Sequence, residues 1–319
     1  MRFTRRSTLA LLALAYVQPG ISLADDDSPL NINLQLKTLG GKQFWTDIRI
    51  QSGWRIQRNH YTHHCRILDH RNIRQAWGSF NQCQHRFDEF VKNGKIGPYK
   101  KKIFVLLHGV IRTRNSLDPL ARYLQDHNVA DVFSWGYAST RQTIHQHAEQ
   151  FGELLSHFPE DADLYLVGHS MGNVVVRSYL KTQQDERIKR MVMLAPPNQG
   201  SAFGRAVNDQ LLFEALWGVS GKELGAGFKE LEAQLAIPEF EFGIIAGQLE
   251  SNLVRNPLLK GPSDLVVSVE ETKLQGAVDF RTVNSTHTRI MNQRETLQYV
   301  QRFLKSGYFE SAVTRKPIH

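Results

Sequence analysis

A serine lies between two glycines in the segment Gly168-His169-Ser170-Met171-Gly172. The apolar run Leu164–Val167 precedes this segment, and a stretch typical of a helix begins at Asn173. This is the G-x-S-x-G pattern in a strand, turn and helix setting, where a sharp turn exposes the serine hydroxyl. Glycines at both flanks let the two backbone arms pass closely, because neither carries a β-carbon. The pattern predicts Ser170 as a nucleophile for acyl transfer; the alternative is a glycine turn that arose by chance.

Other segments accompany this serine in a fixed order. Leu106-Leu107-His108-Gly109 precedes it, Ala195–Ser201 follows it, and His287 lies further on, in Asn284–Thr288. In this order the segments resemble those of bacterial α/β-hydrolase lipases and esterases, over about residues 101–308. The resemblance implies a doubly wound, mostly parallel sheet with helices on both faces, and a serine esterase without a metal or organic cofactor. One departure is Asn173, where many lipases carry glycine.

A serine hydroxyl is a weak nucleophile, so a histidine must take its proton and an acid must orient that histidine. After Ser170, histidine recurs only at His287, just past a predicted strand, and at the terminal His319. We therefore expect His287 to be the base, with a structural histidine as the alternative. As in the lipases that the chain resembles, a terminal helix is expected over Thr288–Leu304.

The acid is expected between the serine and the histidine, which is the order of α/β-hydrolases. The candidates are Asp264, Glu270, Glu271 and Asp279. We expect Asp264, because Gly261–Glu270 resembles the loop that carries the acid in these hydrolases. Where the family usually has glycine after the acid, this chain has Leu265. A surface role for Asp264 is the alternative, and Asp279, at the start of a predicted strand, is the second candidate.

Attack on an ester creates an oxyanion, which backbone N–H groups must stabilise. The N–H of Met171, directly after the nucleophile, is one expected donor. The lipase pattern points to the N–H of Val110 as the other donor, with Gly109 supplying room and an unusual backbone. We expect His108 and His169 to have structural roles.

From residue 101 onward, short apolar runs alternate with segments of helical period, which is typical of βαβ units and a parallel sheet. Strands are predicted at Ile103–Leu107, Val129–Ser134, Leu164–Val167, Ile188–Leu194, Phe240–Ile245 and Phe280–Val283. Helices are predicted at Leu117–Gln125, Thr143–Leu155, Asn173–Lys181 and Met291–Lys305. Loops at the carboxyl ends of such strands carry the chemistry, and the candidate residues follow strands.

Four parts of the chain are distinguished: a leader over residues 1–24, an extension over 25–100, the α/β-hydrolase domain over 101–308 and a tail over 309–319. Within the domain, residues 201–237 form an insertion in which Leu211, Leu212, Phe213, Leu216 and Trp217 give an apolar helix face. Such an insertion could serve as a lid or line an acyl pocket. Ordinary core packing explains the same pattern.

The extension contains alternating stretches at Asn31–Leu36 and Thr46–Ile50, which predict strands. It also holds the only two cysteines, Cys65 and Cys83. A disulfide is expected if the chain is exported, because extracytoplasmic compartments are oxidising. Two free thiols and a zinc site with the neighbouring histidines are the alternatives; the spacing of these residues fits no standard zinc pattern.

The first residues have the order of a secretory signal peptide. Arg2, Arg5 and Arg6 precede the apolar run Leu9–Val17, and Ser22-Leu23-Ala24 suits cleavage after Ala24. We therefore expect an exported, periplasmic or secreted protein; an uncleaved anchor and export by the twin-arginine route are alternatives. The formal charge of +8 includes these three arginines and is otherwise spread along the chain. This favours a solvated surface with weak membrane attraction over nucleic-acid binding.

Together these patterns predict hydrolysis of a carboxylic ester, a lipid or fatty-acyl ester being favoured over a peptide. Transfer of the acyl group to an alcohol would use the same residues. A lipid-binding protein without catalysis is the other alternative, and the complete set Ser170, Asp264 and His287 argues against it.

Overall fold

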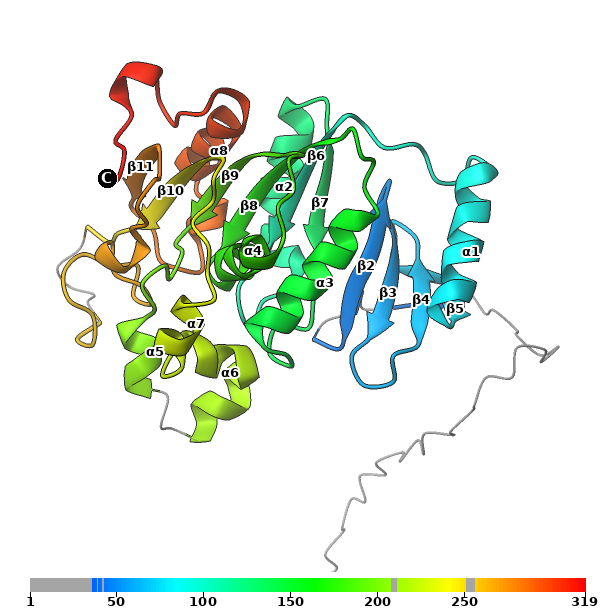
Figure 1. Ribbon diagram of the computed structural model, residues 1–319, viewed down its shortest axis with the longest axis horizontal. Coiled ribbons are helices and arrows are strands. Elements are labelled where there is room, and N and C mark those ends of the chain that lie inside the picture. Colours follow the sequence, from blue (N-terminus) through cyan, green and yellow to red (C-terminus); the bar gives the residue numbers. More distant parts are fainter. Residues whose placement is uncertain (1–35, 39, 42, 208–210, 251–255) are drawn as a thin grey trace, which may run out of the picture. The chain divides into compact units, whose positions relative to one another are not determined.

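The computed structural model describes residues 36–38, 40–41, 43–207, 211–250 and 256–319 (Figure 1). The predicted leader and most of the strand predicted at Asn31–Leu36 lie outside these residues. In the described part of the chain, no helix is long and apolar enough to cross a membrane.

Six parallel strands form the central sheet. In chain order they are β6 (Lys102–Leu107), β7 (Asp131–Trp135), β8 (Asp163–His169), β9 (Ile188–Leu194), β10 (Glu241–Gly247) and β11 (Asp279–Val283). Across the sheet the order is β11-β10-β9-β8-β6-β7, and every adjacent pair is parallel. The predicted doubly wound fold is thus confirmed. The chain leaves the neighbours β6 and β8 in opposite directions, and in folds of this kind functional loops follow the carboxyl ends of such strands.

Helices cover both faces of this sheet (Figure 1). They are α2 (Asp118–His127), α3 (Ile144–Ser156), α4 (Met171–Thr182) and α8 (Arg294–Ser306). Phe151 of α3 and Val175 of α4 pack in one apolar cluster, and Leu120 of α2 and Val300 of α8 pack in another. Because the strands are buried on both faces, they are apolar throughout: β6 buries every residue except Lys102.

The last helix begins later than the sequence predicts. Gln293 has an extended backbone, so α8 starts at Arg294. A single turn of 3-10 helix, η3 (Ile290–Asn292), precedes it. The expectation that a helix starts beside His287 is therefore wrong, and this histidine lies in a loop.

The N-terminal extension contains a second sheet, which is antiparallel. Its strands are β1 (Leu36–Lys37), β2 (Trp45–Gln51), β3 (Trp54–Asn59), β4 (Cys65–Leu68) and β5 (Ile73–Gly78), in the order β1-β5-β4-β3-β2. Helix α1 (Phe80–Lys92) packs on one face of this sheet, and Ser79 and Gln82 form a capping box at its start. Of these elements, the sequence analysis predicted only β2 and the region of β1.

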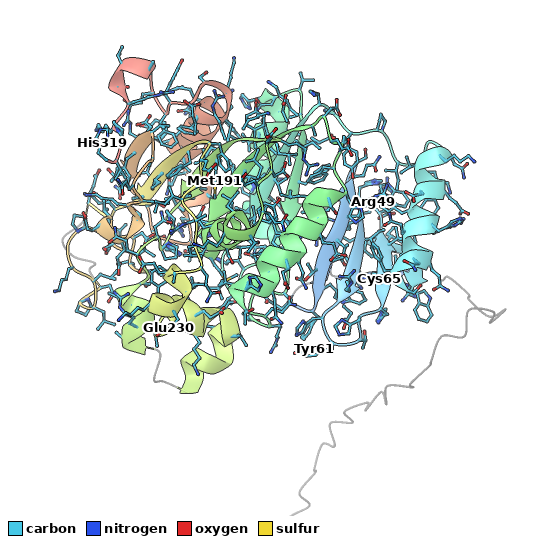
Figure 2. The ribbon with its side chains drawn as sticks, viewed as in Figure 1. Arg49, Tyr61, Cys65, Met191, Glu230 and His319 are labelled. Atoms are coloured by element: carbon cyan, nitrogen blue, oxygen red, sulfur yellow. The ribbon has the colours of Figure 1, made fainter. Side chains whose placement is uncertain are left out.

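The expected disulfide is not formed, because Cys65 and Cys83 are both free thiols. Cys65 lies on β4 (Figure 2) and Cys83 on α1, within the same small apolar core. Burial raises the pKa of both thiols, that of Cys83 to about 12. They behave as small apolar side chains. No group of three His, Cys, Asp or Glu residues that could hold a metal ion occurs among the described residues.

Strand β2 of the extension covers the edge strand β7 of the central sheet through Asp47. The N–H of Asp47 donates to the Gly136 carbonyl at 2.8 Å, and the Gly136 N–H donates to Asp47 Oδ2 at 2.8 Å. The indole N–H of Trp135 donates to the Asp47 carbonyl at 2.9 Å. Arg55 neutralises the buried carboxylate at 2.6 Å. These contacts join the extension to the central sheet at the carboxyl end of β7.

The described residues of the insertion after β9 form the helices α5 (Ala202–Val207), α6 (Leu211–Leu224) and α7 (Phe228–Glu232). Figure 1 shows them grouped beyond the end of the sheet at which β9 finishes. Gly218 interrupts α6 with φ 62°, and Ser220 Oγ donates to the Gln142 carbonyl at 2.6 Å. The insertion therefore rests on the loop that follows β7. The side chains of 211–216, part of the apolar face noted in the sequence, lie outside the described residues.

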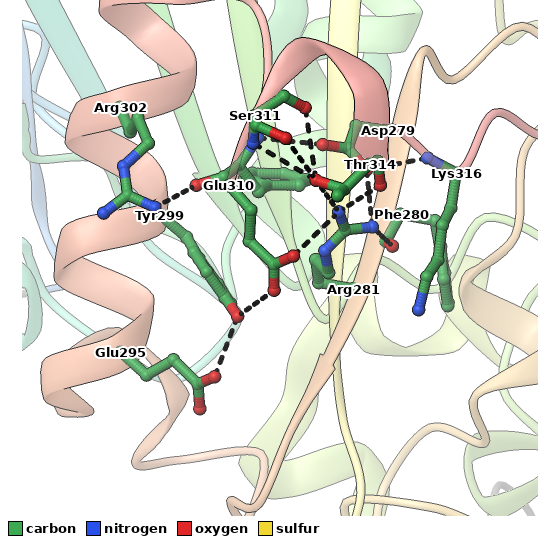
Figure 3. A network of polar contacts seen from close by, with 11 residues as sticks. Asp279, Phe280, Arg281, Glu295, Tyr299, Arg302, Glu310, Ser311, Thr314 and Lys316 are labelled. Carbon is green, nitrogen blue, oxygen red and sulfur yellow. Dashed lines mark hydrogen bonds and ion pairs between the residues drawn. The ribbon is translucent and has the colours of Figure 1, made fainter.

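The C-terminal tail folds back onto β11 (Figure 3). The N–H groups of Phe309 and Lys316 donate to the two oxygens of Asp279, at 2.8 and 3.0 Å. Arg281 binds Asp279 Oδ1 at 2.8 Å and the Thr314 carbonyl at 2.5 Å. Phe309 is fully buried. The tail therefore belongs to the fold and closes the β11 side of the sheet.

Candidate active site

Ser170 lies in the turn between β8 and α4, with φ 53° and ψ −121°. This conformation is strained for a residue with a β-carbon and costs about 1–3 kcal/mol. A β-carbon at Gly172 would lie 2.6 Å from the Leu107 carbonyl oxygen, and one at Gly168 would lie 2.2 Å from Asn173 Oδ1. Both glycines are thus required for the turn to pack between β6 and α4. Ser170 therefore lies directly after the carboxyl end of β8, beside β6.

Two hydrogen bonds join Ser170, His287 and Asp264 in a chain. Ser170 Oγ lies 2.9 Å from His287 Nε2, and His287 Nδ1 lies 2.7 Å from Asp264 Oδ2. All three side chains are buried. With the Nδ1 proton directed to the carboxylate, Nε2 can accept the serine proton, and the carboxylate can stabilise the imidazolium that results. The fold thus brings Ser170 and His287 together, although they are 117 positions apart in the sequence.

The loop after β10 orients Asp264. Its Oδ1 accepts the N–H groups of Val266 and Val267 at 2.9 and 2.8 Å, which leaves Oδ2 for His287. The N–H of His287 in turn donates to the Asp264 carbonyl at 2.9 Å. Leu265 has φ 81°, a left-handed conformation that favours glycine. The loop therefore holds this conformation at the cost of strain in Leu265.

The other carboxylates considered from the sequence have different partners. Asp279 lies at the start of β11, the opposite end from His287, and its two oxygens bind the C-terminal tail and Arg281. Glu271 accepts the N–H groups of Ala202 and Ser268. Glu270 pairs with Lys273 at 2.7 Å. In this structure, the acid that contacts His287 is Asp264.

The loop after β6 lies beside the nucleophile. A β-carbon on Gly109 would lie 3.1 Å from the β-carbon of Ser170, so glycine is what allows this approach. The Gly109 carbonyl accepts from His108 Nδ1 at 2.9 Å and from the Arg112 N–H at 3.2 Å. These contacts orient the peptide group whose other end is the Val110 N–H. The Met171 N–H is the first of helix α4 and has no partner within the helix.

His108 and His169 support the site without touching the Ser170 hydroxyl. Burial lowers the pKa of His108 to about 4, and it lowers that of His169 well below the usual value, so both rings are neutral near pH 7. His169 Nε2 donates to the His287 carbonyl at 2.9 Å. Tyr137, whose ring stacks on that of His108 at 4.2 Å, donates to the His108 carbonyl. These contacts place a rigid, uncharged layer behind the loops.

Asn173, the departure noted in the motif, is fully buried. Its Nδ2 donates to the carbonyls of Ser170 at 3.0 Å and Leu194 at 3.3 Å. The Leu194 carbonyl also accepts the Ser170 N–H at 2.9 Å. Asn173 thus ties the strained turn to the end of β9.

Two residues that contact the loop after β6 were missed by sequence reasoning. They are Tyr137, two residues after the end of β7, and Gln43, from the extension. Neither lies within a recognisable motif, and their proximity to the loop depends on tertiary packing. The sequence of this one chain therefore carries no local pattern that would identify either residue.

No protein-family model matches this sequence, and no curated protein sequence matches it either. Solved structures do match. Phospholipase PlaB from Legionella pneumophila aligns with TM-score 0.44 and 18% identity, over 54% of this chain and 45% of that one. A Bacillus licheniformis lipase in its mature form aligns with TM-score 0.47 and 16% identity, over 61% and 88%. A metagenomic carboxyl esterase aligns with TM-score 0.50 and 15% identity, over 64% and 73%.

The chain has an α/β-hydrolase fold. The parallel sheet flanked by helices and the likeness to the metagenomic esterase carry this assignment. The match to PlaB spans less than half of that protein. At these identities the likeness concerns the fold, and function has to be argued from the site.

Proposed function

We propose that this chain is a serine hydrolase that cleaves carboxylic esters through an acyl-enzyme on Ser170. The observation that carries the proposal is the chain of hydrogen bonds from Ser170 Oγ through His287 to Asp264. The strained turn that presents the hydroxyl adds support, because such strain persists where a site requires it.

In the proposed reaction, Ser170 Oγ attacks the ester carbonyl while its proton passes to His287 Nε2. The carbonyl oxygen becomes an oxyanion, which the N–H groups of Val110 and Met171 stabilise. Collapse of this intermediate breaks the ester bond, and the imidazolium returns its proton to the departing alcohol. Water then attacks the acyl-enzyme by the same steps and releases the acid. Asp264 orients His287 throughout.

A lipid or fatty-acyl ester is the substrate class that we propose. The apolar residues of the insertion's sequence, Leu211 to Trp217, support it, since such segments line acyl pockets or act as lids. The signal-peptide pattern supports an exported protein that meets such esters in the periplasm or outside the cell, with peripheral membrane contact. A panel of p-nitrophenyl esters of rising chain length tests this: a preference for the shortest chains would contradict a lipid substrate.

Covalent labelling with a fluorophosphonate tests the mechanism. We expect the folded protein to label, and Ser170→Ala to abolish labelling and lower turnover by on the order of 10⁶-fold. Failure of the folded wild-type protein to label would overturn the proposal and favour a protein that only binds lipid. Adding an alcohol to the ester assay separates hydrolysis from acyl transfer, because a transferase would form the new ester as its main product.

A further inference from the structure

Gln43, a residue of the N-terminal extension, reaches the loop that carries the proposed oxyanion donor Val110. We propose that Gln43 is a positioning residue for this loop, so that one side chain of the extension supports the proposed oxyanion donor. The inference rests on the proposed function, in which the Val110 N–H stabilises the oxyanion.

The loop after β6 turns sharply around that donor. The Arg112 N–H donates to the Gly109 carbonyl at 3.2 Å, which closes a turn around Val110 and Ile111. Ile111 has φ 63°, and for a β-branched residue this conformation is a clear outlier. Its side chain is 41% exposed, so core packing does not hold it in place. Such strain persists only where the surroundings fix the backbone on both sides.

The start of the turn is fixed by the central sheet. His108 Nδ1 binds the Gly109 carbonyl at 2.9 Å, and Tyr137 donates to the His108 carbonyl. Both donors are buried, His108 directly after β6 and Tyr137 just after β7.

The end of the turn is fixed by Gln43. Its Nε2 donates to the Arg112 carbonyl at 2.8 Å, directly after the strained residue, and lies 3.1 Å from Ser139 Oγ. Its Oε1 accepts from Thr140 Oγ1 at 3.1 Å. The amide is therefore held on both its nitrogen and its oxygen, which fixes its orientation and lets it act as a rigid brace.

The extension makes a second contact with the loop after β6, through Arg114, and this contact strengthens the brace. Arg114, just beyond the turn, donates to the Gly40 carbonyl at 2.5 Å and to Asn72 Oδ1 at 2.7 Å. The extension thus grips the loop after β6 at two points, Arg112 and Arg114. If Gln43 lost its donor, the turn could relax at Ile111 and the Val110 N–H would no longer be held toward the oxyanion.

The test compares Gln43→Met with Gln51→Met. Gln51 is the last residue of β2 and donates to the Gly97 carbonyl at 2.8 Å, so the control removes a hydrogen bond of the same kind from the same extension. We expect Gln43→Met to lower kcat by about 10–100-fold, a fraction of the effect of deleting an oxyanion donor, with KM within about twofold. Affinity for a boronic acid that mimics the tetrahedral intermediate should fall by the same factor. Gln51→Met should leave kcat and boronic-acid affinity unchanged, even where the melting temperature falls.

Hydrogen exchange at the Arg112 N–H supplies a readout that does not depend on catalysis. It should accelerate at least about tenfold in Gln43→Met and remain unchanged in Gln51→Met. Equal kcat for both variants, or unaltered exchange at Arg112, would overturn the positioning role. If the wild-type protein fails to label with a fluorophosphonate, the proposed function falls, while the exchange measurement still decides whether Gln43 holds the turn.

Discussion

The side-chain amide of Asn173 donates to the carbonyl oxygen of Ser170 at 3.0 Å, so the helix that follows the nucleophile braces the strained residue itself. The same amide reaches the Leu194 carbonyl, which also accepts the Ser170 N–H. A glycine at position 173 could make neither contact, so the brace depends on the asparagine side chain.

Replacing Asn173 should therefore weaken both the turn and catalysis. We expect Asn173→Ala to lower the free energy of unfolding by about 1–3 kcal/mol, because two buried carbonyls lose a donor. The catalytic rate constant should fall at least about tenfold as Ser170 drifts from His287. Urea denaturation and kinetics on a p-nitrophenyl ester measure the two effects. Asn173→Asp is the matched control: it keeps the size and removes the donor, and activity equal to wild type in this variant would contradict the bracing role.

Mutation should distinguish the two candidate acids, Asp264 and Asp279, by its effects on kcat and on stability. Asp264→Asn is expected to lower kcat by about 10⁴-fold with little loss of stability, because the wrong tautomer of His287 is then favoured. Asp279→Asn should instead destabilise the fold by roughly 1–3 kcal/mol, as it weakens the contacts with Arg281 and the C-terminal tail, and leave kcat per folded molecule intact. Kinetics together with thermal melting distinguish them. The reverse pattern would make Asp279 the acid.

Leu265 should reveal the strain in the acid loop. Its φ of 81° costs a leucine about 1–2 kcal/mol, whereas glycine adopts it freely. Part of this gain is lost because glycine raises the entropy of the unfolded chain. We expect Leu265→Gly to be at least as stable as wild type, and Leu265→Val to be less stable by about 1 kcal/mol or more, with kcat preserved in the glycine variant. Urea denaturation midpoints give the order of stability of the three proteins. A glycine variant less stable than the valine variant would contradict the claim that Leu265 is strained.

Stability should fall with acidification because of the buried histidines. Burial lowers the pKa of His147 to about 3, from an ordinary value of 6.5. Between those values the unfolded chain binds a proton that the folded chain does not bind, so lowering the pH favours unfolding by about 1.4 kcal/mol per pH unit. His147→Leu removes this one-proton difference. It should therefore reduce the slope of the unfolding free energy against pH, between pH 6 and 4, by about 1.4 kcal/mol per pH unit. Denaturation curves across that range measure the slope, and an unchanged slope would show that His147 does not contribute.

The local parts of this fold were predictable from the sequence. Ser170 and the strands around it were identified because glycine spacing and apolar runs act over a few residues. The six-stranded sheet followed for the same reason. The sheet of the extension was mostly missed, since β3 and β5 contain many polar residues and do not form apolar runs.

Long-range contacts were harder to predict. Asp264 was chosen by resemblance in spite of Leu265, and only the observed positive φ shows how the loop accommodates a leucine. Gln43 and Tyr137 could not be foreseen, because their partners are in segments far away in the sequence. The two cysteines were expected to pair, yet they pack as thiols in an apolar core.

The contacts of Asp47 also limit the order in which parts of the protein can fold during synthesis. Trp135 and Asp47 are 88 positions apart, so strand β2 must wait for β7 to be synthesised before it can dock. His287 then reaches Ser170 across 117 positions. Loops of this length close slowly, because their entropy is lost before the contact is gained. A fragment that ends before residue 287 lacks the proposed base. The proposed reaction therefore requires that synthesis has passed this residue and that His287 has packed against Ser170.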